Sequence, residues 1–318
     1  MAALIAAVPV LIWIVIRSGK AGMKKSTTAF FTLMLIPLSF FAARIGYMLV
    51  DYEYYLSDGF AFFFESLVDF EQEGYLCYGL LAGALLAAWM TSRIFRVKLA
   101  KLLDIVSAPA AALFCLLTVL EGIFGAGYGW TLEDWFTEGE GYSVFTLEDP
   151  SFFQRFPFGV SDYYGEWRWA VFVLLALLLA VICVAVACTK RKGDGTRFSL
   201  LLLTYASLQL LGESLRQDSI PKWGFVRVNQ VLSAVLILGL LIYFEVRTGA
   251  GLKEWIASGA LILLSFLVVT AMEFAMEGKI SAIEWMTMDV CYLFTALASV
   301  LAMLVLLKLW KKNDPEKN

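Results

Sequence analysis

The chain has 318 residues, of which 60% are hydrophobic, 15% aromatic and only 17% charged, and its mean hydropathy is +0.76. Soluble domains carry roughly 45–50% apolar and about 25% charged residues, so this composition argues against a soluble enzyme, a disulfide scaffold or a disordered chain. The formal net charge of −3 provides no basic surface for nucleic acid. The sequence contains no histidine, the commonest general base and metal ligand. Any chemistry must therefore depend on carboxylates, tyrosine, arginine, lysine or a group of the substrate.

Apolar runs separated by charged breaks predict nine membrane-spanning helices. The expected spans cover residues 2–16, 28–50, 75–91, 102–124, 169–188, 198–215, 228–246, 256–274 and 289–309. The first has only about 15 residues, or roughly 22 Å of helix, against a hydrocarbon core of about 30 Å. It is therefore either thinly spanning or truncated at its start. The fold class expected is an all-α, polytopic membrane bundle of about nine helices.

The charges of the connecting loops predict how the bundle is inserted. The loops after spans one, three and five and the tail after span nine are basic, whereas residues 51–73 contain seven acids and no base. Residues 130–168 contain eight acids and two arginines. Because basic loops stay on the cytoplasmic side, the N-terminus is expected outside and the C-terminus inside.

The segment 125–168 is long for a connection and is rich in glycine, tryptophan, tyrosine and phenylalanine. This density of aromatic residues predicts an ordered outer cap in the headgroup zone. The five cysteines all lie in apolar runs without metal-ligand spacing, so they are interpreted as small buried hydrophobic residues. They are Cys77, Cys115, Cys183, Cys188 and Cys291.

Most of the polar residues in the predicted spans share one depth, near the outer leaflet. Gln209, Glu213 and Arg216 follow a spacing of i, i+4 and i+7, which puts them on one helical face. The other members of this layer are Arg44, Tyr75, Tyr78, Glu121, Glu166, Arg168, Arg227, Asn229 and Gln230. For any one of them, snorkelling at a span end or a structural ion pair is the simpler explanation. Their convergence favours a site at headgroup level, where arginine side chains suit a lipid phosphate.

Five segments, in this order, resemble the prolipoprotein diacylglyceryl transferase family. They are FFAARIGYMLVDYEYYL (40–56), EGYLCYGLLAG (73–83), LLDIVSAPAAALFCLLTVLEGIFGAGYG (102–129), YASLQLLGESLRQD (205–218) and WGFVRVNQVLSAVLIL (223–238). The resemblance runs collinearly over residues 1–246. It implies a seven-span transferase-like membrane core in residues 1–246, with the outer cap 125–168, and an appended two-span hairpin with a basic cytoplasmic tail in residues 247–318.

The resemblance implies an alkyl transfer at the outer face of a bacterial cytoplasmic membrane. A cysteine thiolate of a prolipoprotein lipobox attacks the glycerol carbon of phosphatidylglycerol, and glycerol phosphate leaves. The expected partners are therefore phosphatidylglycerol, the prolipoprotein signal peptide with its lipobox, and membrane lipids. No metal or organic cofactor is required.

The same resemblance nominates site residues, by matching positions and by the needs of the chemistry. The matching positions are Arg44, Tyr47, Glu213, Arg216 and Gln230. The sequence departs from the family pattern at Tyr78, where the family has histidine, at Gln209, where it has arginine, and near Glu121, at the place of a signature arginine. The catalytic candidates are Glu121, Glu213, Arg216 and Tyr78. The candidates for phospholipid binding are Arg44, Tyr47, Gln209, Arg227 and Gln230.

Within these sets, Arg216 and Arg44, with Arg227 third, are expected on the phosphate side, since fixed cations stabilise the charge of the leaving group. Glu213 or Glu121 is expected either to act as the base or to orient an arginine, and Tyr78 to donate a hydrogen bond to phosphate. Two alternatives stay open. One is a non-enzymatic relative that binds phospholipid or lipoprotein precursor at the outer leaflet. The other is a transporter or channel, which the scarcity of polar residues near the bilayer midplane disfavours.

Overall fold

The computed structural model describes residues 2–57, 59–69, 74–136, 143, 147, 149–190, 195–217, 222–223, 226–280 and 285–313. Nine long helices account for the nine predicted spans, and each predicted boundary falls within a few residues of the observed one. These helices are α1 (Ala2–Lys20), α2 (Lys25–Val50), α5 (Cys77–Phe95), α6 (Leu99–Ile123), α8 (Val171–Cys188), α9 (Thr196–Leu215), α10 (Val228–Thr248), α11 (Leu252–Met276) and α12 (Met288–Lys312).

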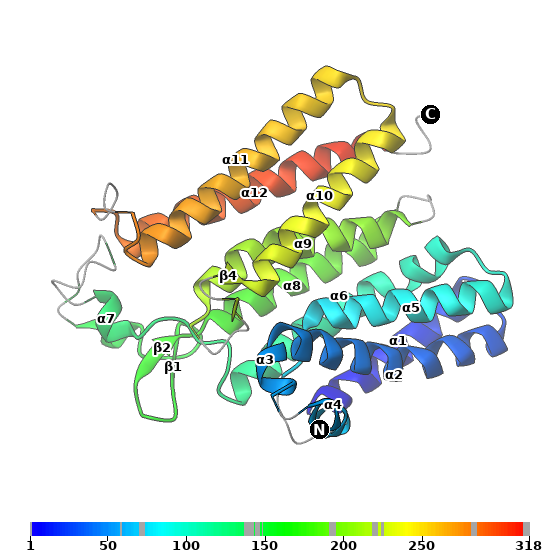
Figure 1. Cartoon of the computed structure of the whole chain (residues 1–318), viewed down its shortest axis with the longest axis horizontal. Coiled ribbons are helices and arrows are strands. Elements are labelled where there is room, and N and C mark those ends of the chain that lie inside the picture. The colour runs from blue at the N-terminus through cyan, green and yellow to red at the C-terminus, as the bar shows by residue number, and fades with distance from the viewer. Residues whose placement is uncertain are drawn as a thin grey trace.

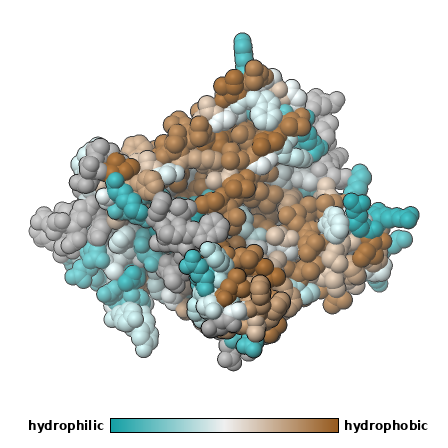
Figure 2. Space-filling view, viewed as in Figure 1, coloured by the Kyte–Doolittle hydropathy of each residue, from teal (hydrophilic) through white to brown (hydrophobic). Residues whose placement is uncertain are grey.

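Eight helices of the described chain, α2, α5, α6 and α8–α12, are long and apolar enough to cross a membrane. The short first span forms α1, which packs on α6 through the buried side chains of Val10 and Ile14. Figure 2 shows hydrophobic side chains over the middle of the molecule, with hydrophilic groups toward its two ends. This distribution suits a helical bundle surrounded by lipid and confirms the predicted fold class.

The long helices run roughly side by side, and their connections alternate between two ends (Figure 1). One end carries the short helices α3 (Tyr52–Tyr55), α4 (Phe60–Val68) and α7 (Leu132–Phe136) and the hairpin of β1 (Gly159–Ser161) and β2 (Trp167–Trp169). The described parts of both acidic loops thus lie at this end, away from the C-terminus. We call it the acidic end. Its outward orientation stays a prediction.

Glycines allow the closest helix contact. A Cβ added at Gly79 of α5 would lie 2.4 Å from the Cα of Ala43 of α2, and one at Gly83 would lie 2.4 Å from the Cα of Ser39. Real Cβ atoms do not approach so closely, so the Gly79-x-x-x-Gly83 pair is required for α2 and α5 to pack backbone to backbone. This contact places the first turn of α5 beside the C-terminal third of α2.

The central helix is α9, which packs against α6, α8, α10 and α12. Its contacts form the larger of two buried apolar clusters. The smaller one joins α1, α2, α5 and α6. Since α9 is surrounded on most sides, its two ends are fixed with respect to four neighbouring helices.

The described part of the outer segment is ordered around aromatic rings. The ring centroid of Trp169 lies 5.3 Å from that of Phe153, 5.8 Å from that of Phe136 and 6.0 Å from that of Trp135. The β1–β2 pair is antiparallel, with Gly159 opposite Trp169. An η1 turn (Pro150–Phe152) precedes the hairpin, and a second pair of β3 (Lys222–Trp223) and β4 (Val226–Arg227) leads into α10.

Candidate functional site

A cluster of charged and polar side chains forms at the acidic end, where α6 and α9 finish and α10 begins. Arg216 follows the last residue of α9, and its Nη1 donates to Oε2 of Glu121 in the last turn of α6, at 3.0 Å. The two side chains keep 19% and 36% of their surface exposed. Because the pair is partly solvated, it exchanges partners more readily than a buried ion pair.

Gly122, next to Glu121, allows α6 and α8 to pack closely near the cluster. A Cβ at this position would lie 2.1 Å from Cδ2 of Phe172, so only glycine lets α8 pack at this height. The glycine-rich loop then turns back, and the carbonyl of Tyr128 accepts the backbone N–H of Gln217 at 2.9 Å. The loop therefore lies directly against the residues that follow α9.

Arg227 closes the C-terminal end of α9 from the other side. It stands just before α10, is 8% exposed, and its Nη1 donates to the carbonyl oxygens of Glu213 and, at 2.8 Å, of Arg216. The last carbonyls of a helix have no partner inside it, so a guanidinium at this place satisfies them. Arg227 thereby fixes the course of the backbone after α9, and with it the position of Arg216.

Glu213 is 2% exposed and belongs to a chain of hydrogen bonds that reaches α5. Its Oε1 accepts from Nδ2 of Asn229 at 2.9 Å. Ser233 donates to the carbonyl of Asn229 at 2.6 Å and lies 2.5 Å from the hydroxyl of Tyr78. Since the single hydroxyl proton of Ser233 is used on the carbonyl, Tyr78 is the donor in that contact.

Gln230 connects α10 to the hairpin that follows the core. Its Nε2 donates to Oγ of Ser214 at 2.9 Å and to Oε1 of Glu273 at 2.8 Å. Ser214 in turn donates to the same oxygen of Glu273. The other oxygen of Glu273 lies 3.8 Å from Nε of Arg227. We call Glu121, Glu213, Ser214, Arg216, Arg227, Gln230 and Glu273 the arginine–carboxylate cluster.

Arg44 lies in a different set of contacts. It is fully buried, and it donates to the carbonyl of Ser66 from Nε at 3.2 Å and from Nη2 at 3.0 Å, and to the carbonyl of Gly74 from Nη1 at 3.1 Å. Its guanidinium also lies over the rings of Tyr55 and Tyr75, at 5.6 and 5.7 Å. Burial raises the pKa of both tyrosines, and the nearby arginine partly offsets this.

Tyr47 belongs with Arg44, since its ring fills the space where a Cβ of Gly74 would stand. The structure thus brings Glu121, Glu213, Arg216, Arg227 and Gln230 together and joins Tyr78 to them through Ser233 and Asn229. Gln209 is half-buried one turn before Glu213 on α9. Arg44 and Tyr47 instead hold the connection between α2 and α5. That all these residues line one lipid cavity stays a prediction.

Two other members of the predicted layer serve the hairpin. Arg168 pairs with Asp162 at 2.7 Å and with Glu166 at 2.8 Å. The Arg168 pair and two backbone N–H groups lower the pKa of Asp162, although its desolvation, the largest contribution, acts in the opposite direction. These contacts stabilise the β1–β2 turn.

Sequence reasoning did not select Ser214, Ser233 and Glu273. Serines in helices commonly bond to their own backbone, so nothing in the pattern singles them out. Glu273 did carry a signal, since it is an acidic residue inside a predicted span, and such residues mark function by default. It was assigned to an appended hairpin instead. Among the described residues no group of three or more cysteine or carboxylate side chains is placed to hold a metal ion.

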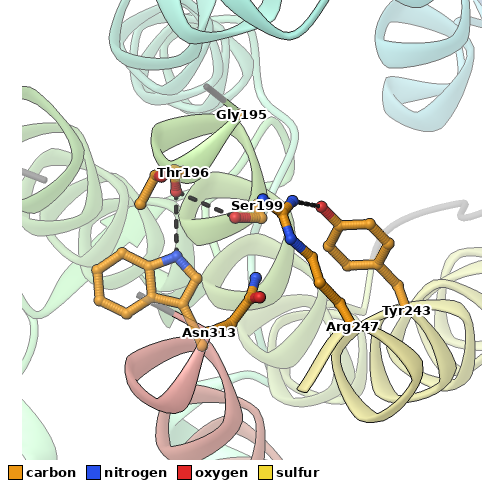
Figure 3. A pocket seen from close by; sticks show the side chains of 7 residues that line it. Gly195, Thr196, Ser199, Tyr243, Arg247 and Asn313 are labelled. Atoms are coloured by element: carbon orange, nitrogen blue, oxygen red, sulfur yellow. Dashed lines mark hydrogen bonds between the residues drawn. The ribbon is translucent and has the colours of Figure 1, made fainter. Parts of the chain in front are cut away.

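A groove lies at the opposite ends of the same helices, between α6, α9 and α10. Figure 3 shows the smaller pocket that adjoins it, between α9, α10 and α12. The groove encloses about 430 Å³ and includes Phe198, Leu202 and Leu240. At its margin Arg247 donates to the hydroxyl of Tyr243, and Ser199 donates to the carbonyl of Thr196 at 3.1 Å. None of the predicted site residues lines this groove, so it does not belong to the arginine–carboxylate cluster.

The fold and the cluster together define a multi-pass membrane protein with a polar site at one end of its helices. A family model described as prolipoprotein diacylglyceryl transferase matches residues 1–246, and the chain belongs to this family. A phosphatidylglycerol–prolipoprotein diacylglyceryl transferase of Listeria innocua is 28% identical over 239 residues, which cover 73% of this chain and 79% of the relative. One of Bacillus cytotoxicus is 26% identical over 246 residues, covering 76% and 84%. The predicted resemblance is confirmed.

Proposed function

We propose that this protein is a phosphatidylglycerol–prolipoprotein diacylglyceryl transferase of a bacterial cytoplasmic membrane, with its active face toward the outer leaflet. The observation that carries the proposal is the arginine–carboxylate cluster, which α6, α9, the start of α10 and Glu273 of α11 build at one end of the helices. The names of the relatives supply the substrate class. The acidic loops at the same end support the outward orientation.

The reaction needs a cationic place for the phosphate of phosphatidylglycerol. Arg216 and Arg227 hold their guanidinium groups there, with 19% of the Arg216 side chain and 10% of the Arg227 side chain exposed. As the carbon–oxygen bond between the diacylglycerol and the phosphate breaks, the electron pair of that bond stays on the phosphate oxygen. Preorganised guanidinium groups stabilise this developing charge, an effect worth roughly 3–4 kcal/mol when one comparable donor is removed.

The reaction also needs a thiolate, because a thiol is a poor nucleophile. Glu213 or Glu121 takes the proton from the lipobox cysteine. Its sulfur then forms the new bond to the glycerol carbon, and glycerol phosphate leaves. Tyr78 occupies the place of the family's histidine and donates to Ser233, so it orients the Asn229–Glu213 pair rather than accepting the proton.

The alternative function is binding of phospholipid or precursor without transfer. It is favoured by one observation, namely that each of the two proposed phosphate-binding arginines lies near a carboxylate of the protein itself. Purified protein with phosphatidylglycerol and a lipobox peptide distinguishes the two. A transferase releases glycerol phosphate and adds diacylglyceryl to the peptide, as detected by mass spectrometry. Retained lipid and peptide with neither product would establish the binder.

A further inference from the structure

The hairpin of α11 and α12 lies beyond residue 246, where the family match ends, yet it reaches the cluster. Glu273 stands in the last turn of α11 at the acidic end. Its Oε1 accepts from both Ser214 and Gln230, and its Oε2 faces Arg227. Residues outside the family core therefore contribute a side chain to the site.

The groups around Glu273 form a donor set suited to a phosphate. A hydroxyl, an amide N–H₂ and a guanidinium converge on one carboxylate, and phosphate oxygens accept the same three kinds of donor. Glu273 is 18% exposed and Arg227 is 10% exposed, so the set is partly screened from solvent. An intramolecular anion thus occupies three donors of the kinds that bind phosphate.

Glu273 changes the summed formal charge of the arginine–carboxylate cluster. Within the family core the cluster contains two arginines, Arg216 and Arg227, and two acids, Glu121 and Glu213, which sum to zero. Glu273 changes this sum to −1. A negative charge close to a phosphate-binding guanidinium lowers its attraction for a second anion, and the effect is stronger in a partly desolvated site than in water.

The hairpin is fixed in this position by the outer segment. Nε1 of Trp130 donates to the hydroxyl of Tyr292 on α12 at 2.9 Å, and the ring of Trp135 stacks on Tyr292 with centroids 5.9 Å apart. Ser143 donates to Asp289 at 3.2 Å. Together with the packing of α12 on α9, these contacts hold Glu273 at the cluster.

We propose that the carboxylate of Glu273 competes with the lipid phosphate for Ser214, Gln230 and Arg227 and so weakens phospholipid binding at this site. This inference rests on the proposed function for the identity of the lipid. The hairpin raises the concentration of phosphatidylglycerol that the site requires, and substrate entry exchanges one anion on these donors for another. If Glu273 were only structural, its removal would instead weaken lipid binding, because the site would lose part of its support.

The test compares Glu273→Gln and Glu273→Ala with the unmodified protein. Glutamine keeps an oxygen for Ser214 and Gln230 but removes the charge, and alanine releases the donors altogether. Binding of phosphatidylglycerol and of phosphatidylcholine to the detergent-solubilised full chain is measured by native mass spectrometry. Where glycerol phosphate is released, KM and kcat for phosphatidylglycerol are measured as well. Thermal unfolding checks that the variants are folded.

Both variants are expected to bind phosphatidylglycerol and phosphatidylcholine about three- to tenfold more tightly, since both lipids carry the phosphate, and to lower KM for phosphatidylglycerol by a similar factor. Glu277→Gln is the matched control, since it removes one acid from the end of the same helix, where Glu277 pairs with Lys279. Unchanged or weaker binding of phosphatidylglycerol to Glu273→Gln overturns the inference, whether or not turnover is seen. Tighter binding without turnover supports it and contradicts the transferase proposal alone.

Discussion

Arg44 and Arg216 occupy the same acidic end but are satisfied in different ways. The described hydrogen bonds of Arg44 go to backbone carbonyls, and its side chain is fully buried. Arg216 keeps 19% of its side chain exposed and pairs with a carboxylate that is itself 36% exposed. A guanidinium held by backbone oxygens has fixed geometry. One held by a solvated carboxylate can exchange that partner for a phosphate. The contrast favours a structural role for Arg44 and a role in the site for Arg216. Arg227 combines the two arrangements, since its Nη1 donates to backbone carbonyls while its Nε faces the carboxylate of Glu273.

The largest expected effect comes from Arg216→Ala. Loss of a cation on the phosphate side should reduce kcat for diacylglyceryl transfer by about 100-fold or more. The thermal unfolding temperature in detergent should change by only a few degrees, because the lost ion pair is partly exposed. Arg216→Lys is the matched control and should retain part of the rate. Turnover equal to that of the unmodified protein would remove Arg216 from the mechanism.

Arg44→Met tests whether Arg44 stabilises the fold rather than binding the substrate. Methionine fills similar volume but leaves the carbonyls of Ser66 and Gly74 without their donor. Each unsatisfied buried group costs about 1–3 kcal/mol, so stability should fall by roughly 3 kcal/mol. The unfolding temperature in detergent should show this loss. A folded, equally stable variant without turnover would place Arg44 in the phosphate site, as its sequence position suggested.

The fold follows from the sequence because a lipid environment leaves few alternatives. Long apolar runs must form helices that satisfy their own backbone, so nine long helices are readable from the pattern of apolar runs. Eight of these, in the described part of the chain, are long and apolar enough to cross a membrane. The spacing of Gly79 and Gly83 allows a close helix contact, but only the structure shows that α2 is the partner of α5. What the sequence does not show is which helices surround α9, since tertiary packing decides this. The apolar residues of the C-terminal hairpin join the same buried cluster as the core helices.

The site was predictable in part, because polar residues stand out in apolar spans and their depth can be read from the span ends. The spacing of Glu213 and Arg216 and their depth indicate one polar layer, and the structure groups five of the predicted residues there. The partners of each residue were not readable. Nothing in the sequence distinguishes Arg44, whose described hydrogen bonds go to backbone oxygens, from Arg216, which donates to the side chain of Glu121. Glu273 comes to the cluster from 43 residues beyond Gln230, a contact that only the folded chain defines.

Asp104 of α6 provides a structural carboxylate at the opposite end of α9, to be compared with the carboxylates of the site. Its carboxylate accepts the backbone N–H groups of Gly195, Arg197 and Phe198, at 2.8, 2.9 and 3.0 Å. It therefore caps the N-terminus of α9 from the neighbouring helix. Asp104→Ala should destabilise the protein by about 1–2 kcal/mol. KM for phosphatidylglycerol should not change, because the cap lies at the far end of the helix. A changed KM with unchanged stability would contradict a structural role.

Tyr78→Phe has the smallest expected effect. It tests most directly whether a residue of this end is structural, like Arg44, or belongs to the site, like Arg216, because Tyr78 stands where the family has histidine. Its hydroxyl donates to Ser233, which leads through Asn229 to Glu213. Removing one buried hydrogen bond should cost about 1 kcal/mol of stability. If Tyr78 only orients Glu213, kcat should fall less than about fivefold and KM should stay constant, as steady-state kinetics will show. A loss of 100-fold or more would mean that the hydroxyl acts on the substrate directly, and Tyr78 would then belong with Arg216 rather than with Arg44.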